Sequence, residues 1–342
     1  MRKSRSLPKV LVPLLLAVIA SSVMAADLVT VDTPDGKRQV MCEVLEETYR
    51  YVRVESEGEE QELYTAPKYA DDPDDVDVVV LDIERENFPS AYGRANMDRK
   101  NRKFAAAYKK YADAGEELSG DTAWVAPYIW YYAANSAFNE AKYARMDEEE
   151  KAEWYERAAG RYERLLEREE EHYFAPDAKL GLAKARVQLE QYGKARDVLD
   201  EIADSDYPEE TKRHARVWEG NLMIAEERVD EAIETLQALQ EELMDDYPQL
   251  AYQAMMFEAF AWQTKENFPR AESLFRDAGL RSPDDEMRAE AFNNRGLSLK
   301  ARGQVREALF SFLRVVVLHS DIRHEYQRAL FNAAVTSKEY YS

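Results

Sequence analysis

The residues that most often carry catalysis or bind transition metals are few and scattered in this sequence. Its four histidines are His172, His214, His319 and His324, and its single cysteine is Cys42. The last two histidines are five residues apart, so a helix does not place them on one face, as an i, i+4 metal pair requires. Cys42 lies in an apolar, strand-like stretch without a nearby histidine, which favours a buried small hydrophobe over a nucleophile.

Carboxylates are abundant, but they do not form a recognisable catalytic site. The runs Glu148 to Glu150 and Glu167 to Glu171 are typical of solvated helix faces and ends. Asp71 to Asp77 offers the hard oxygens that Ca²⁺ prefers, yet it lacks the central glycine and distant glutamate of a helix-loop-helix site, so we favour an acidic loop over calcium. The sequence has no phosphate-binding glycine loop and no HExxH motif. We therefore predict no catalytic residues, no metal and no cofactor.

The overall charge excludes one large class of partners. The 342 residues contain 67 Asp and Glu against 46 Lys and Arg, a net charge of −21. Such a surface repels phosphate, which argues against nucleic acid as a partner. One cysteine also excludes a disulfide framework.

Residues 1–25 have the pattern of an export signal. Four basic residues without an acid precede the apolar run Val10 to Ala20, and Val23 and Ala25 occupy the small-residue positions before a cleavage site. The apolar run is too short to span a bilayer, so we favour cleavage near Ala25 over a retained anchor. Cleavage leaves 42 Lys and Arg against 67 Asp and Glu, a net charge of −25. No other apolar run is long enough for a transmembrane span, so we expect a periplasmic or secreted protein.

Two regions with different periodicity follow. Residues 26–86 alternate in short β-branched and aromatic runs between turn signals such as Pro34-Asp35-Gly36. We predict about five antiparallel strands, at 28–31, 39–45, 51–54, 62–64 and 76–83, which form a small all-β barrel-like or sandwich module that leans on the rest of the chain. From residue 87 to 342 the spacing is helical.

The helical region repeats an alanine that is followed four residues later by a large apolar residue. The pairs are Ala107/Tyr111, Ala158/Tyr162, Ala195/Leu199, Ala232/Leu236, Ala271/Phe275 and Ala308/Phe312, and the last four intervals between the alanines are 37, 37, 39 and 37 residues. A small residue stands twelve positions before five of the six alanines; the exception is Met146. Small residues at this spacing let two antiparallel helices approach closely, and we expect the i+4 residue to fill the seam between neighbouring pairs.

With Pro283 ahead of Gly296, Gly303 and Ala308 to Phe312, these residues resemble the tetratricopeptide repeat, and the frame also fits Gly220/Ala232/Leu236 and Ala259/Ala271/Phe275. A β module ahead of such repeats resembles exported bacterial repeat proteins. The resemblance covers residues 88 to 342 and implies a mainly α fold: antiparallel helix pairs that form a right-handed α-superhelix, with about six pairs plus a terminal helix. The second unit departs from the pattern, because its helices are stretched and its frame breaks at Met146.

The resemblance also implies a concave groove lined by first-helix residues. Counting back from each alanine places ten candidate binding residues there: Tyr92, Asn96, Arg99, Lys184, Asn221, Gln253, Met256, Phe260, Asn293 and Lys300. The same count places Asp177, Leu180, His214 and Glu290 in the groove. Bases outnumber acids among the groove positions, which predicts that the groove accepts an acidic or polar segment.

The sequence therefore favours a non-catalytic protein-interaction scaffold in the bacterial cell envelope, with a protein partner. The alternative is a carbohydrate- or ligand-binding protein that uses the β module or the aromatic cluster around Trp124 and Trp130. A hydrolytic enzyme on a helical scaffold is the third hypothesis. A homo-oligomer is a further alternative, in which the apolar residues Leu330, Phe331 and Val335 contact another subunit.

Overall fold

The computed structural model describes residues 27–34, 36–56, 59–69, 78–85, 88–116, 118 and 120–341. The expected export signal and the acidic run Asp71 to Asp77 lie outside these residues. Within them, no helix is both long enough and apolar enough to cross a membrane.

The first part of the chain is one curled antiparallel sheet. Its strands are β1 (Asp27–Asp32), β2 (Arg38–Glu47), β3 (Tyr51–Ser56), β4 (Glu59–Tyr64) and β5 (Val79–Glu84), in the order β4-β3-β2-β1-β5. Val29 pairs with Val40 on one side and with Ile83 on the other. Alternate apolar side chains of β1, β2, β3 and β5 form a small core, as the predicted alternation requires. The five predicted strands are confirmed, except that residues 76–77 of the last one lie outside the described residues.

The buried face of this sheet also holds the thiol of Cys42. Burial raises the pKa of Cys42 to about 11; Asp27 adds to the shift and Arg85 opposes it. The thiol is therefore protonated at neutral pH and is not a reactive nucleophile.

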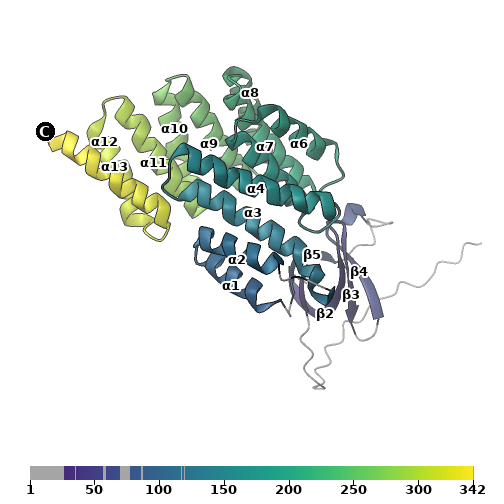
Figure 1. The fold of residues 1–342 in the computed structure, drawn as a ribbon. Helices are drawn as coiled ribbons and strands as arrows, with labels where there is room; N and C mark the ends of the chain where they lie inside the picture. Colours follow the sequence, from purple (N-terminus) through teal and green to yellow (C-terminus); the bar gives the residue numbers. More distant parts are fainter. Residues whose placement is uncertain are drawn as a thin grey trace, which may run out of the picture.

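The rest of the chain is a stack of helix pairs. The helices are α1 (Ser90–Lys100), α2 (Phe104–Glu116), α3 (Ala126–Tyr143), α4 (Glu148–Arg168), α5 (Ala175–Gln188), α6 (Tyr192–Asp204), α7 (Glu209–Ala225), α8 (Val229–Leu243), α9 (Pro248–Thr264), α10 (Phe268–Arg281), α11 (Asp285–Ala301), α12 (Val305–Leu318) and α13 (Arg323–Tyr341), with short 3₁₀ turns η1 (Pro67–Tyr69) and η3 (Gly120–Val125). Within the described part of the chain these helices form six antiparallel pairs and the final α13. They wind into a superhelix (Figure 1), which confirms the predicted fold class.

Glycines on first helices let the helices of the array approach closely. A Cβ on Gly296 would lie 2.4 Å from the ring of Phe312, and a Cβ on Gly220 would lie 2.6 Å from the side chain of Leu236. In these two units the large i+4 residue therefore packs on the glycine of its own pair. The expected packing between neighbouring pairs occurs in the stretched second unit, where the ring of Tyr162 in α4 covers Gly181 of α5.

We expect Gly296→Ala to lower the free energy of unfolding by about 1–3 kcal/mol, because the new methyl group must displace the fully buried Phe312 ring. Urea denaturation monitored by circular dichroism measures the change. Gly160→Ala is the matched control: it lies within α4 with open space around it, so we expect no loss and a gain of up to about 1 kcal/mol from helix propensity. Equal losses in both variants would contradict this packing.

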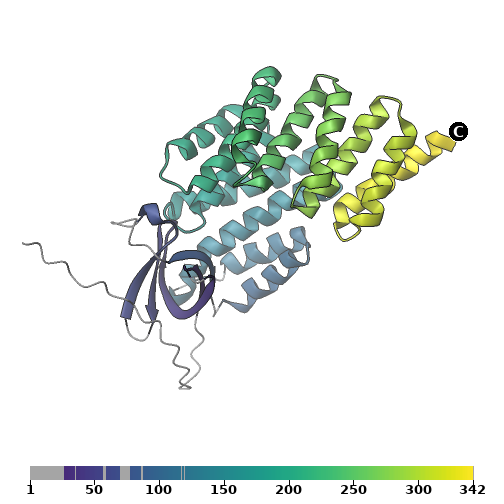
Figure 2. The same ribbon diagram turned by 180° about the vertical axis from the view of Figure 1, so that it is seen from behind.

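Three hydrogen bonds fix the β module to two connections of the helical array. The backbone N–H of Tyr49 donates to the carbonyl of Glu171 at 3.0 Å, and the Tyr49 hydroxyl donates to Asp206 Oδ1 at 2.7 Å. Lys68 Nζ donates to the carbonyl of Tyr207 at 2.6 Å. These contacts set the module against the turns that precede α5 and α7 (Figure 2), and they confirm that the module leans on the repeats.

A buried ion pair completes this junction. The Arg85 guanidinium lies 3.0 Å from Asp27 Oδ2 and pairs with Glu47, which also accepts a hydrogen bond from the Tyr128 hydroxyl of α3. The same guanidinium lies 4.2 Å from the centre of the Trp124 ring. Arg85 therefore links the sheet to the first turn of α3.

The array also closes on itself through a contact of Arg102, Lys142 and Tyr143 with Glu286 and His324. The Tyr143 hydroxyl donates to Glu286, and Lys142 Nζ lies 3.7 Å from the same carboxylate. An Arg102 nitrogen lies 3.1 Å from His324 Nδ1, and the rings of Tyr143 and His324 are 4.1 Å apart. This closing contact joins the turn after α1 and the end of α3 to the first turns of α11 and α13.

Candidate functional site

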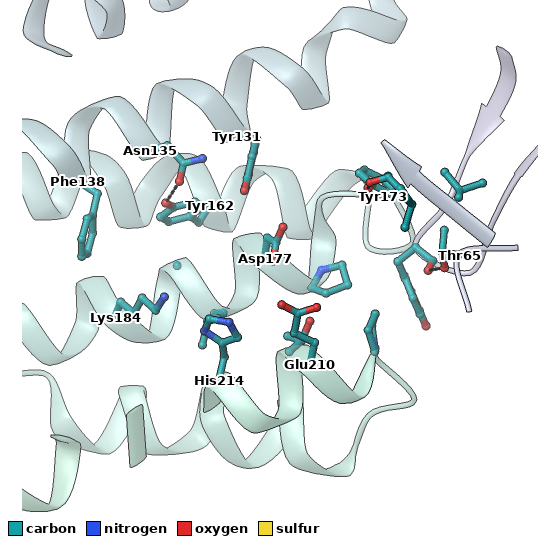
Figure 3. Close-up of a pocket in the computed structure, with 18 of the residues that line it drawn as sticks. Thr65, Tyr131, Asn135, Phe138, Tyr162, Tyr173, Asp177, Lys184, Glu210 and His214 are labelled. Carbon is teal, nitrogen blue, oxygen red and sulfur yellow. Dashed lines mark hydrogen bonds between the residues drawn. The ribbon is translucent and has the colours of Figure 1, made fainter. Parts of the chain in front are cut away.

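A cleft of about 640 Å³ lies on the inner side of the array, between first helices and the β module. Helices α3, α5 and α7 supply its walls, and residues of β5 with Tyr49, Thr65 and Tyr173 line the end at the module (Figure 3). Pro176 and Pro208, which also line it, stand at the starts of α5 and α7, where proline costs no helical hydrogen bond. The docking of the module therefore determines where the cleft ends.

The wall formed by α3 is aromatic and carries amides. The ring of Tyr131 stacks on Phe174 at 4.3 Å, with only 5° between the planes. The Tyr162 hydroxyl donates to Asn135 Oδ1 at 2.5 Å, so this part of the wall is held in place. Phe138 and Asn139 continue the lining one turn further along α3. This wall offers flat apolar surface together with amide hydrogen-bonding groups.

The opposite wall carries charges, arranged in two groups. Asp177 of α5 and Glu210 of α7 lie near the module, whereas Lys184 and His214 lie further along the same two helices (Figure 3). Burial raises the pKa of Asp177; Lys184 opposes the shift and Glu210 adds to it. Burial lowers the pKa of Lys184 to about 8, although Asp177 opposes that shift. Among the described residues, neither carboxylate forms an ion pair with Lys184 or with any other cation.

Only one of the ten residues predicted to bind a partner lines this cleft, namely Lys184. Tyr92 and Met256 are each 4% exposed and pack in the apolar core. Asn293 is fully buried and donates to Glu325 of α13 at 2.5 Å and 3.0 Å. We leave these three out of the candidate site, because a partner cannot reach a buried side chain.

The remaining six predicted residues are partly exposed but lie outside the cleft. Arg99 donates hydrogen bonds to Asn96 Oδ1 at 2.8 Å and 3.1 Å and lies over the Tyr132 ring. Arg99 and Asn96 are therefore bonded to each other. Lys300 Nζ forms an ion pair with Glu339 Oε2 of α13, at 3.3 Å. The ring of Phe260 packs on Phe275 at 5.2 Å. Asn221 and Gln253 are half-buried on α7 and α9.

The sequence prediction missed Asn135, Asn139 and Glu210, together with the lining from the β module. The two asparagines lie in the second unit, whose frame breaks at Met146 because that residue falls in the turn between α3 and α4. Glu210 lies one helical turn before His214, so extending the counted positions by one turn finds it. No local pattern indicates which face of the array the module covers.

The tryptophans of the alternative ligand site lie in the core. Trp130 is buried, and Trp124 is packed against the same aromatic core with the Arg85 guanidinium over its ring. Arg164 lies over Trp130 at 5.2 Å. The two rings therefore do not form an open surface on which a sugar stacks.

Three buried histidines make the free energy of unfolding depend on pH. Burial lowers the pKa of His172 to about 3, that of His214 to about 4 and that of His324 to about 4. Because the unfolded chain has the usual value of about 6.5, it binds more protons than the folded chain between pH 6.5 and about 4. Stability therefore rises with pH in this window.

We expect the free energy of unfolding to fall when the pH is lowered from 7 to 5, because the buried histidines take up protons on unfolding. Burial raises the pKa of the Glu47 and Asp177 carboxyls, so their release of protons on unfolding reduces the net uptake. Urea denaturation at several pH values in this range gives the free energy of unfolding, and the slope of that energy against pH gives the number of protons taken up. His324→Gln should reduce the uptake by about one proton. If the free energy of unfolding of the parent protein did not change with pH, the histidines would not be buried in the neutral form.

Comparisons with known proteins concern the helical array. Residues 118–245, which include all three helical walls of the cleft, match the family described as tetratricopeptide repeat-like domain. No curated protein sequence matches the chain. A tetratricopeptide repeat protein from Parabacteroides merdae is similar at 16% identity and a TM-score of 0.42, over 71% of this chain and 100% of that one.

Two further solved structures are similar. The apo form of RapI shares 12% identity at a TM-score of 0.48, over 73% of this chain and 96% of that one. YrrB, described as a TPR protein with an unusual peptide-binding site, shares 19% identity at a TM-score of 0.33, over 65% of this chain and 96% of that one.

Proposed function

We propose that this chain is a non-catalytic scaffold of the bacterial cell envelope that binds a segment of a protein partner in the cleft between α3, α5, α7 and the β module. The observation that carries the proposal is the cleft itself, whose volume of about 640 Å³ is within the range of about 300–1,000 Å³ typical of ligand sites. The basic and apolar leader pattern in residues 1–25 supports export.

The lining supports a peptide rather than a purely apolar ligand. Asn139 lines the cleft and forms no hydrogen bond within the described chain, so its amide is able to pair with an extended backbone. Tyr131 and Phe138 offer surface for apolar side chains. The walls therefore offer amides, aromatic rings and charged groups, each of which is able to contact a different part of an extended segment.

Site-specific photocrosslinking tests this function. The photoreactive residue p-benzoylphenylalanine is placed at Asn139 in the cleft or at Glu234, which is exposed on the outer side of α8. After irradiation in envelope extracts, mass spectrometry should identify the same protein segment repeatedly from Asn139, and not from Glu234. Equal crosslinking from both positions, or none from the cleft, would contradict the proposed function.

Export has a separate measurement. Intact mass of the protein from the envelope fraction should correspond to a chain that begins after Ala25. A protein that keeps residues 1–25 would overturn the cleavage.

A further inference from the structure

We infer that the cleft selects a segment of mixed charge, with an anionic group against Lys184 and a cationic group between Asp177 and Glu210. This inference rests on the proposed function and specifies the chemistry of the partner segment. It replaces the expectation of an acidic or polar segment, because Glu210 faces the cleft in addition to the predicted groove positions.

The basic pole is the ammonium of Lys184, and the neutral imidazole of His214 lies near it on α7. The ammonium of Lys184 has no carboxylate within ion-pair distance among the described residues, and it lies 5.2 Å from the centre of the Trp218 ring. Nδ1 of His214 is buried without a hydrogen-bond partner. A carboxylate placed here accepts a charge-assisted hydrogen bond from Lys184. Its negative charge also stabilises the ammonium, whose charged form burial disfavours.

The acidic pole consists of Asp177 and Glu210. Both side chains are exposed to the cleft from neighbouring helices, and Figure 3 shows their carboxylates directed toward the same space. Two carboxylates without a cation repel each other, and a basic side chain between them relieves this repulsion. The rings of Tyr131 and Tyr173 line the same part of the cleft and favour the flat guanidinium of an arginine or the stem of a lysine.

The helix keeps the two poles apart. Asp177 and Lys184 are seven residues apart on α5, which corresponds to about 10 Å along the axis, so they cannot neutralise each other by direct contact. An extended peptide covers about 3.3 Å per residue, so the poles match a basic and an acidic residue about three positions apart. A chain-terminal carboxylate at the same distance supplies the same chemistry.

Four capped, fluorescein-labelled hexapeptides of equal length serve as probes in fluorescence anisotropy. One has lysine and glutamate three positions apart, one has two lysines, one has two glutamates and one is uncharged. We expect the mixed-charge peptide to bind at least tenfold more tightly than each of the other three. The preference should weaken when salt is raised from 50 to 500 mM, since higher ionic strength screens both poles.

Matched variants locate the binding. Lys184→Met and Glu210→Gln should each weaken binding of the mixed-charge peptide at least fivefold, whereas Lys194→Met on α6 and Glu234→Gln on α8, both exposed and outside the cleft, should change it less than twofold. Thermal unfolding shows that each variant is folded. Equal binding of a single-sign peptide, equal losses in the control variants, or no binding of the mixed peptide would overturn the inference. If Asn139 still crosslinks to one segment in that case, the proposed function stands without the two poles.

Discussion

Replacing Arg85 with methionine is expected to lower the free energy of unfolding by about 3–5 kcal/mol, the largest single effect that we predict. The Arg85 side chain is 14% exposed and pairs with Glu47, which is only 4% exposed. Burial raises the pKa of Glu47, while the Tyr128 hydroxyl and Arg85 oppose that shift. Without the guanidinium, the Glu47 carboxylate is left in the junction without its cation, and the sheet loses its link to α3.

Arg53→Met is the matched control, because it removes an arginine from the same sheet. Arg53 pairs with Glu46 at 3.1 Å and Glu62 at 3.2 Å, but all three side chains are more than a third exposed. Solvent screens exposed pairs, so we expect little or no change in the free energy of unfolding. Guanidinium denaturation monitored by tryptophan fluorescence measures both variants. Adding Glu47→Gln to Arg85→Met should recover part of the loss, and similar losses for both arginines would contradict a buried junction.

The second large effect is expected at the closing contact. Changing Glu286 to alanine removes the acceptor of the Tyr143 hydroxyl and the carboxylate beside Lys142, Arg102 and His324. Tyr143, Lys142 and Arg102 then lose the carboxylate that they share. We expect the closed arrangement to lose about 2–4 kcal/mol relative to an open one, so that the end of α3 separates from α11 and α13.

Distances between spin labels at Lys103 and Arg323 measure this opening. Both positions are exposed and flank the closing contact, and Cys42→Ala removes the single native thiol. The parent protein should give one narrow distance distribution, and Glu286→Ala a longer and broader one. Asp285→Ala, which removes the neighbouring exposed pair with Arg288, should leave the distribution unchanged. An unchanged distribution in Glu286→Ala would show that the contact does not hold the array closed.

The local periodicity of the sequence predicted the elements, but not the contacts between distant elements. The alanine frame located the helix pairs because each pair must bring small residues together, as at Gly220 and Gly296. Alternation located the strands, because one face of each strand must be buried. These signals are contained within about 40 residues, which is the length of one repeat.

The cleft was only partly predictable because it depends on contacts across the fold. Glu47 meets Tyr128 and Tyr143 meets Glu286, and neither pairing follows from a repeat position. Lys184 was found because its unit follows the frame. The groove positions around Met256 and Asn293 were placed correctly on first helices, yet the adjacent helices cover them. A repeat frame gives the direction of a side chain, whereas burial depends on what packs against it.

The central claim is that the cleft between α3, α5, α7 and the β module is where a partner segment binds. Its most direct test is the dissociation constant of the segment identified by crosslinking at Asn139, measured with Asn135→Trp, whose indole fills the cleft, and with Glu234→Trp on the outer side of α8. We predict that Asn135→Trp weakens binding at least tenfold while Glu234→Trp leaves it within twofold of the parent. Unchanged affinity in a folded Asn135→Trp protein would contradict the claim.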